Sequence, residues 1–358
     1  MYFDPEPKES RKDVYNFEQE YDALKKSILG RDRIIVIKGL RRTGKTTLMK
    51  VVYNELKEAK CFIDGRVVEP RQSAVYSALL NAVAGAVTEK YVGVKAREII
   101  EAIRFEFMGI SLSLKKERAL RFFSDVDKVL ERKKETLIVF IDEVQRINPG
   151  NIDGIIAHVF EHTKNIKFVL AGSEIGLLDQ VIGTDAKSSL YGRPKKIIQI
   201  QKLTEEQAKG FLRSGFKQAG IKMEEDEIER VVEVLDGVIG WLTLFGYYAI
   251  EEGKKTALKK VIEEGAKITA EEIENFLRGR EIARRKYLRI MEGLVAGLRW
   301  IEVKRLLEAE EGKKVNDKMV SKYLAELEKY SFIVKTDGRY FLSDPMIQRG
   351  VKLLTNGK

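Results

Sequence analysis

Residues 39–46 read Gly-Leu-Arg-Arg-Thr-Gly-Lys-Thr and match the pattern G-x-x-x-x-G-K-[ST] at every fixed position. The apolar run 34–37 precedes this segment, and a helical pattern from Thr46 to about Glu58 follows it. Glycines in such a loop let backbone N–H groups surround phosphate oxygens, and the N-terminus of the next helix adds positive potential. The segment therefore predicts a phosphate-binding loop in an α/β domain; the alternative is a glycine-rich structural turn.

Within this loop, each residue type has an expected role. We expect Lys45 to bridge the β- and γ-phosphates of a nucleotide, and the hydroxyl of Thr46 to bind Mg²⁺. The predicted nucleotide-binding residues are Gly39, Leu40, Arg41, Arg42, Thr43, Gly44, Lys45, Thr46 and Thr47.

Two acidic residues supply the second half of a nucleotide site. The apolar run Leu137–Ile141 ends in Asp142 and Glu143, and ligand sites in parallel sheets lie at the carboxyl ends of strands. We expect Asp142 to hold Mg²⁺, through water, and Glu143 to orient or deprotonate the attacking water. A solvated turn is the alternative interpretation of paired acids after a strand.

A third polar residue follows another apolar run. Phe168–Ala171 is followed by Gly172 and Ser173. If this strand lies between the strands that carry the loop and the acids, the Ser173 hydroxyl can bond the γ-phosphate or the water. An N-cap for the next helix is the alternative and is compatible with that role.

The pattern of apolar runs predicts three domains. Five nearly continuous apolar runs alternate with helical segments up to about residue 203, which indicates a five-stranded parallel sheet buried on both faces. Residues 1–30 form an N-terminal segment of this core, and the alternating pattern at about 104–114 predicts an inserted hairpin, either a surface elaboration or a partner-contacting arm. Thr204 to Gln207 is a capping box that opens a helical domain at 204–280. Three helices and a hairpin with a turn at Asp337-Gly338 predict a winged helix at 281–358.

Composition limits the class of protein. Hydrophobic residues make up 44% and charged residues 34% of the 358, which excludes disordered and fibrous chains. The one cysteine, Cys61, excludes a cysteine-built metal site and an internal disulfide, and suits the cytoplasm. We expect no signal peptide and no membrane association, since the apolar stretch 237–250 is too short to span a bilayer.

His158 and His162 match the zinc-protease string H-x-x-E-H, but the chain has no third histidine, so we interpret them as a helix face.

Several motifs in this order resemble the archaeal ATPase family, a group of AAA+-related, STAND-type P-loop proteins. The resemblance is carried by the loop, Phe140–Gln145, Ala171–Leu178, Leu190–Arg193 and Leu235–Leu242. It covers essentially the whole chain and implies ATP or ADP as the nucleotide, an AAA+-like core with a central loop strand, a helical lid and a winged helix. It also implies that Arg193 senses the γ-phosphate, in its own subunit or a neighbouring one.

Two positions depart from the family pattern. Phe17 stands where relatives have an arginine in an Asn-Arg-Glu motif, and Ile239 stands where relatives have proline in a Gly-x-Pro motif. Both positions lie near the nucleotide in relatives, so the departures bear on nucleotide affinity and not on the phosphate loop.

Positive charge is concentrated near the C-terminus. Residues 281–358 hold 17 Lys and Arg against 11 Asp and Glu, whereas the rest of the chain holds 48 against 44. Lys318, Lys322 and Arg339 lie on the predicted recognition helix and wing, where they suit DNA, although packing against the core is an equal use of such a domain.

These observations predict an ATP-binding switch that hydrolyses ATP slowly and controls the position of the lid and winged helix, with ATP and an unidentified protein as partners. The alternatives are an ATP-gated DNA-binding protein akin to origin-recognition initiators and an ATP-binding scaffold with little turnover. The oligomeric state stays open.

Overall fold

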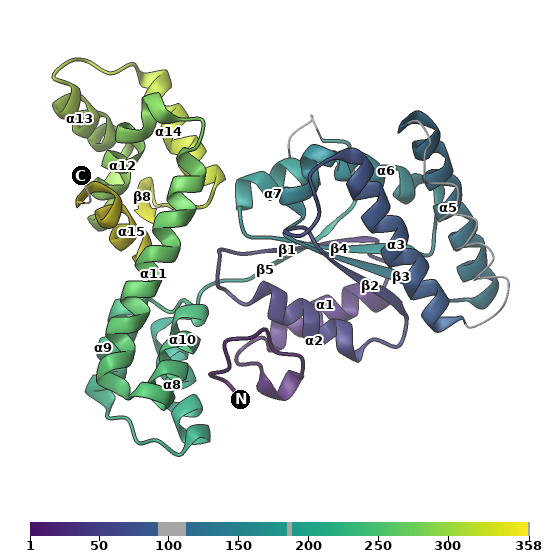
Figure 1. The fold of residues 1–358 in the computed structure, drawn as a ribbon, viewed down its shortest axis with the longest axis horizontal. Helices are drawn as coiled ribbons and strands as arrows, with labels where there is room; N and C mark the ends of the chain where they lie inside the picture. The colour runs from purple at the N-terminus through teal and green to yellow at the C-terminus, as the bar shows by residue number, and fades with distance from the viewer. Residues whose placement is uncertain (92–111, 185–187, 357–358) are drawn as a thin grey trace.

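The computed structural model describes residues 1–91, 112–184 and 188–356. A parallel α/β core forms one lobe, and a helical lid and winged helix form the other (Figure 1). The predicted hairpin lies outside the described residues, except that 112–114 begin helix α5 (Leu112–Lys133). None of the described helices combines the length and apolarity required to cross a membrane.

The core sheet confirms the predicted five parallel strands. Its strand order is β2-β3-β4-β1-β5, so the loop strand β1 lies between β4 and β5. The strands are β1 (Ile34–Lys38), β2 (Ala59–Asp64), β3 (Leu137–Asp142), β4 (Ile166–Gly172) and β5 (Lys196–Gln199).

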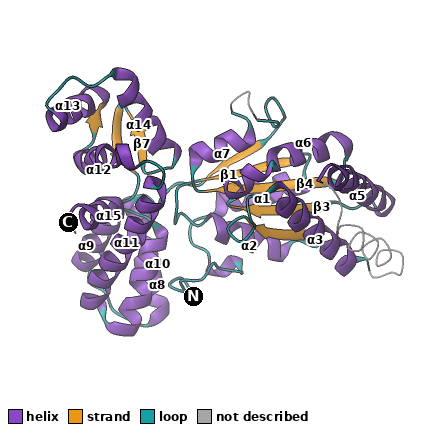
Figure 2. Cartoon of the chain, turned by 45° about the horizontal axis from the view of Figure 1, so that its top comes forward, coloured by secondary structure: helices purple, strands orange, loops and turns teal. Residues whose placement is uncertain are grey.

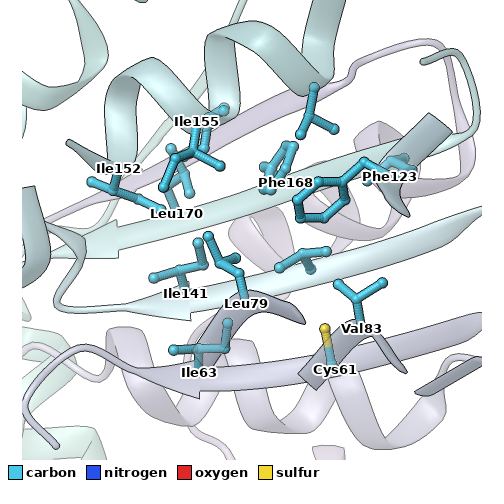
Figure 3. Packing of buried hydrophobic residues seen from close by; sticks show 14 of the residues in the cluster. Cys61, Ile63, Leu79, Val83, Phe123, Ile141, Ile152, Ile155, Phe168 and Leu170 are labelled. Atoms are coloured by element: carbon cyan, nitrogen blue, oxygen red, sulfur yellow. The ribbon is translucent and has the colours of Figure 1, made fainter. Parts of the chain in front are cut away.

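Helices cover both faces of this sheet, which explains the continuous apolar runs. One face packs against α3 (Gln72–Lys90), α5, α6 (Ile152–His162) and α7 (Ile175–Ile182), as the cluster around Phe168 and Leu170 shows (Figure 3). The other face packs against α1 (Glu18–Leu29) and α2 (Lys45–Glu55). Alternate strand residues therefore enter different cores: Ile34 and Val36 belong to the first, and Ile35 and Ile37 to the second.

The lid and winged helix share a long helix. The lid consists of α8 (Glu205–Ala219), α9 (Glu225–Leu235), α10 (Ile239–Glu252) and α11 (Lys254–Leu277), and α8 begins at the predicted capping box. α11 continues from the lid toward the winged helix (Figure 1). The winged helix comprises α12 (Arg284–Gly293), β6 (Leu298–Arg299), α13 (Trp300–Glu311), α14 (Asp317–Lys329), β7 (Ile333–Thr336) and β8 (Arg339–Leu342), and α15 (Pro345–Asn356) follows and packs on α11 (Figure 2).

The N-terminal segment is anchored in the lid. The ring of Phe3 is buried and lies 4.8 Å from the Phe216 ring, measured between centroids. A Cβ atom at Gly215 or Gly246 would come within 2.2 Å of this ring, so glycines on α8 and α10 make room for it. The chain then returns through the 3₁₀ turn Arg11–Asp13 to α1 in the core.

Candidate functional site

The sheet order brings the predicted site residues together. Because β4 lies between β1 and β3, the carboxyl ends of these three strands are adjacent, with Lys38 beside Gly172. The loop follows β1, Glu143 follows β3 and Ser173 follows β4. The condition set for Ser173, a strand between the loop strand and the acidic strand, is met.

The loop has the backbone conformation that its glycines allow. Gly44 has φ +95°, a left-handed value that favours glycine, and its missing Cβ would lie 2.7 Å from the Phe17 ring. Phe17 therefore packs on the loop at the position where relatives have arginine.

Lys45 opens α2 inside the loop. Its side chain is 5% exposed, and Nζ donates a hydrogen bond to the Leu40 carbonyl at 2.6 Å. Burial lowers the pKa of Lys45 to about 8, an effect that nearby Glu143 and Asp142 partly oppose. The ammonium group thus lies beside the loop backbone, where it can meet a phosphate oxygen.

Thr46 and Asp142 form a pair of oxygen donors. The Thr46 hydroxyl donates to Oδ2 of Asp142 at 2.6 Å, and Oδ1 accepts the Glu143 N–H at 3.0 Å. Asp142 is 1% exposed, and burial raises its pKa, which the bond from Thr46 partly opposes. A hydroxyl and a carboxylate in contact are the ligands that Mg²⁺ accepts, so the residues fit this ion.

Glu143 is held from two sides. It follows β3 with a left-handed φ of +48°, and its Oε2 accepts hydrogen bonds from Ser173 Oγ at 2.9 Å and from Gln145 Nε2. Sequence reasoning did not single out Gln145, although it belongs to the Phe140–Gln145 motif.

A cavity of about 490 Å³ opens beside these groups. Its walls come from the loop, the lid and the N-terminal segment, including Lys45, Thr46, Thr47, Glu143 and Ser173. Ile239 lines it too, so both departures from the family pattern lie at the cavity, since Phe17 is in its wall. Arg66 and Arg146 also line the cavity and add positive charge, although the sequence analysis did not identify them. Arg66 follows the carboxyl end of β2, and Arg146 follows that of β3.

Arg193, the predicted γ-phosphate sensor, lies outside this cavity. Its guanidinium pairs with Glu161 on α6 and donates to the Ser189 carbonyl, and it is not among the residues that line the cavity. His158 and His162 also lie on α6, with ring centroids 4.0 Å apart. Across the described ranges, no group of three or more His, Cys, Asp or Glu residues is placed to hold a metal.

The side chain of Arg41 leaves the loop and reaches the winged helix. Nη2 donates to Glu174 at 2.6 Å, and Nη1 donates to the Tyr330 carbonyl at 3.0 Å, just after α14. The guanidinium carbon is 5.5 Å from the Phe332 ring centroid. This loop residue thus joins the core to the winged helix.

The side chain of Arg42 joins the loop to both other domains. It donates to Glu272 on α11 at 2.8 Å and lies 3.7 Å from Asp344, which precedes α15. Its guanidinium carbon is 4.2 Å from the Trp241 ring centroid, and its carbonyl accepts the Gly240 N–H at 3.0 Å. Both arginines, which were predicted as nucleotide-binding residues, are among the residues that line the cavity, and their side chains also make contacts between domains.

Comparison with known families identifies the family of the chain. A family model described as an ATPase domain predominantly from Archaea matches residues 15–245, more than half of the chain. The chain belongs to this archaeal ATPase family. The resemblance drawn from the motifs is therefore confirmed. A second model, the C-terminal winged helix-turn-helix domain of MCM proteins, matches residues 281–342 of this ATPase.

Solved structures of similar fold support the whole architecture. A Walker-type ATPase of Pyrococcus abyssi is 27% identical with a TM-score of 0.81, over 98% of this chain and 100% of that chain. The ORC2 protein of Aeropyrum pernix, in its ADPNP-ADP complexes, is 15% identical with a TM-score of 0.63, over 99% and 96%. The second likeness shows the fold alone. No significant match was found among curated proteins.

Proposed function

We propose that this ATPase is a nucleotide-controlled switch of the STAND type: it binds ATP with Mg²⁺, hydrolyses it slowly, and couples the nucleotide state to the positions of the lid and winged helix. The carrying observation is that Arg41 and Arg42, inside the phosphate loop, contact the winged helix and the lid directly. A change in the loop backbone is thereby transmitted to both domains.

The proposed chemistry uses the residues at the strand ends. Lys45 and the loop N–H groups bind the phosphates, and Thr46 and Asp142 hold Mg²⁺, which neutralises charge on them. Glu143 orients the water and accepts its proton. Ser173, which lines the cavity, is placed to contact the water or the γ-phosphate.

The position of Arg193 outside the cavity supports slow turnover. An arginine that neutralises charge on the transferred phosphoryl group accelerates hydrolysis by about 10³–10⁵. Arg193 is paired with Glu161 outside the cavity, so this help requires either a rearrangement or an arginine from a neighbouring subunit.

The test measures the distance between domains. Spin labels at Lys128→Cys on α5 and Asp337→Cys in the wing, in a Cys61→Ala background, report the core-to-wing separation. We expect the Glu143→Gln variant with ATP and Mg²⁺ to give a different distance distribution from the wild type with ADP. Identical distributions in all nucleotide states would refute the switch.

Two variants separate binding from turnover. Lys45→Ala should abolish nucleotide binding and the distance change, whereas Lys50→Ala, on the same helix, should preserve both. Glu143→Gln should bind ATP and reduce hydrolysis to a slow residual rate that single-turnover measurements can follow. Wild-type protein that binds ATP without turning it over would favour the scaffold alternative instead.

A second candidate is ATP-gated DNA binding. Lys318 and Lys322 are exposed on α14, and the other end of that helix faces the core, since Lys329 contacts Gly176. The first part of the recognition helix is therefore accessible while the domain is docked. The third predicted contact, Arg339, donates to the Gly297 carbonyl within the winged helix at 3.1 Å.

A further inference from the structure

Gln145 is built into the space behind Glu143. It lies in the 3₁₀ segment Val144–Gly150, is 6% exposed and is not among the residues that line the cavity. Its amide lies between the Glu143 carboxylate and Gly172 at the end of β4. A Cβ atom at Gly172 would come within 2.3 Å of Gln145 Oε1, so the glycine leaves room for this amide.

The orientation of the amide follows from charge. Nε2 donates to Glu143 Oε2, whereas the reverse orientation would place the amide oxygen against a carboxylate oxygen. This orientation leaves Oε1 of Gln145 buried and without a hydrogen-bond partner among the described residues, which is energetically unfavourable. A methionine would fill the same volume without an unpaired acceptor, so packing alone does not account for glutamine here.

The two donors act on one carboxylate oxygen. Ser173 and Gln145 both donate to Oε2 of Glu143, and no described residue donates to Oε1 of that side chain. Glu143 lines the cavity, so its second oxygen is left for a ligand in the cavity. Two donors on one carboxylate oxygen restrict the rotamers of the side chain, and such restriction maintains a reactive geometry.

We infer that Gln145 is a positioning residue: together with Ser173 it orients the Glu143 carboxylate toward the attacking water. Gln145 is not among the residues that line the cavity, so it acts through Glu143 and not directly on the nucleotide or the water. The inference rests on the proposed function, because it assigns to Glu143 the role of orienting that water.

The test uses Gln145→Met, which keeps the volume and removes the donor, with Gln199→Met on the exposed face of β5 as the matched control. We expect single-turnover hydrolysis to fall about 10- to 100-fold in Gln145→Met. The KM, the affinity for a fluorescent ADP analogue and the thermal midpoint should stay at wild-type values. Ser173→Ala, which removes the other donor, should lower the rate in the same way.

A double-mutant cycle distinguishes positioning from structure. In the Glu143→Gln background, adding Gln145→Met should cause no further loss of rate, because the side chain it orients is already gone. A further loss of similar size, a fall in analogue affinity or a wild-type rate for Gln145→Met would overturn the inference. A wild-type rate for Glu143→Gln would instead refute the proposed role of Glu143.

Discussion

Replacing Arg42 by methionine should lower the free energy of unfolding of the nucleotide-free protein. The substitution removes the cation that the loop, the lid and the winged helix share. Arg42 bonds Glu272 at 2.8 Å, lies 3.7 Å from Asp344 and stacks over Trp241. The Asp344 side chain is only 12% exposed. The substitution therefore leaves a carboxylate in a nearly dry junction without its arginine.

The magnitude follows from burial. Removing one partner of a buried ion pair costs about 3–5 kcal/mol, because the remaining charge stays desolvated. The side chains of Arg42 and Glu272 are 19% and 27% exposed, so water screens part of the loss. We therefore expect the free energy of unfolding to fall by about 3 kcal/mol, the lower end of this range.

The stability deficit of Arg42→Met should depend on pH, because it arises from the ionised carboxyl group of Asp344. Burial raises the pKa of Asp344 from 3.8; Arg42, the Met346 N–H and the Trp241 N–H oppose the rise, and Glu272 adds to it. Without Arg42 the pKa rises further. A carboxyl group whose pKa is higher in the folded than in the unfolded state destabilises the folded protein at neutral pH, and this penalty disappears as the pH falls through the folded pKa toward 3.8.

Chemical denaturation between neutral pH and about pH 4 checks this. In a Trp300→Phe background, Trp241 fluorescence reports the junction itself. The deficit of Arg42→Met should shrink as the pH falls, and adding Asp344→Asn should remove most of it at neutral pH. Arg349, the other cation that acts on Asp344, stays in all variants, and Arg278→Met at an exposed site is the charge-matched control. A deficit that is constant with pH and unchanged by Asp344→Asn would refute the reasoning.

Three further predictions concern other parts of the chain. Phe3→Ala should lower the free energy of unfolding by about 3–5 kcal/mol by emptying the space between two lid helices, whereas Val67→Ala, at an exposed site, should have little effect in the same denaturation assay. Burial raises the pKa of the Cys61 thiol to about 12, so maleimide should label it only after denaturation, and rapid labelling of folded protein would contradict its burial. If the winged helix binds DNA, neutralising Lys318 and Lys322 should lower affinity and reduce the slope of log K against log salt by about 2, and no binding at low salt would eliminate this function.

Local patterns were sufficient to predict which residues lie together at the candidate site. The loop at 39–46 and the acids at 142–143 are contiguous in sequence, and each follows an apolar run that forms a buried strand. Their meeting depends only on the general rule that parallel strands present their carboxyl ends at one edge. The prediction for Ser173 depended on the position of its strand in the sheet, because the apolar sequence 168–171 does not determine the order of the strands.

Contacts between domains could not be predicted in this way. Arg42 and Glu272 are 230 residues apart, and nothing in the local pattern of either identifies the other. Arg193 shows the converse: the sequence motif suggests a phosphate sensor, but the fold places Glu161 of α6 beside its guanidinium. Side-chain partners of long arginines depend on the packing of whole domains, which periodicity does not encode.

The turn after β4 connects these contacts to the chemistry. Three successive residues there face three parts of the molecule: Ser173 donates to Glu143, Glu174 accepts from Arg41, and the Ile175 N–H donates to Ser331 in the winged helix at 2.8 Å. Because phosphate is bound largely by loop backbone, the variable loop positions are free to carry side chains such as Arg41 outward. On the proposed function, we therefore expect a displacement of this turn to change the orientation of Glu143 and the docking of the winged helix together, so that a partner that pulls the winged helix away would also alter hydrolysis.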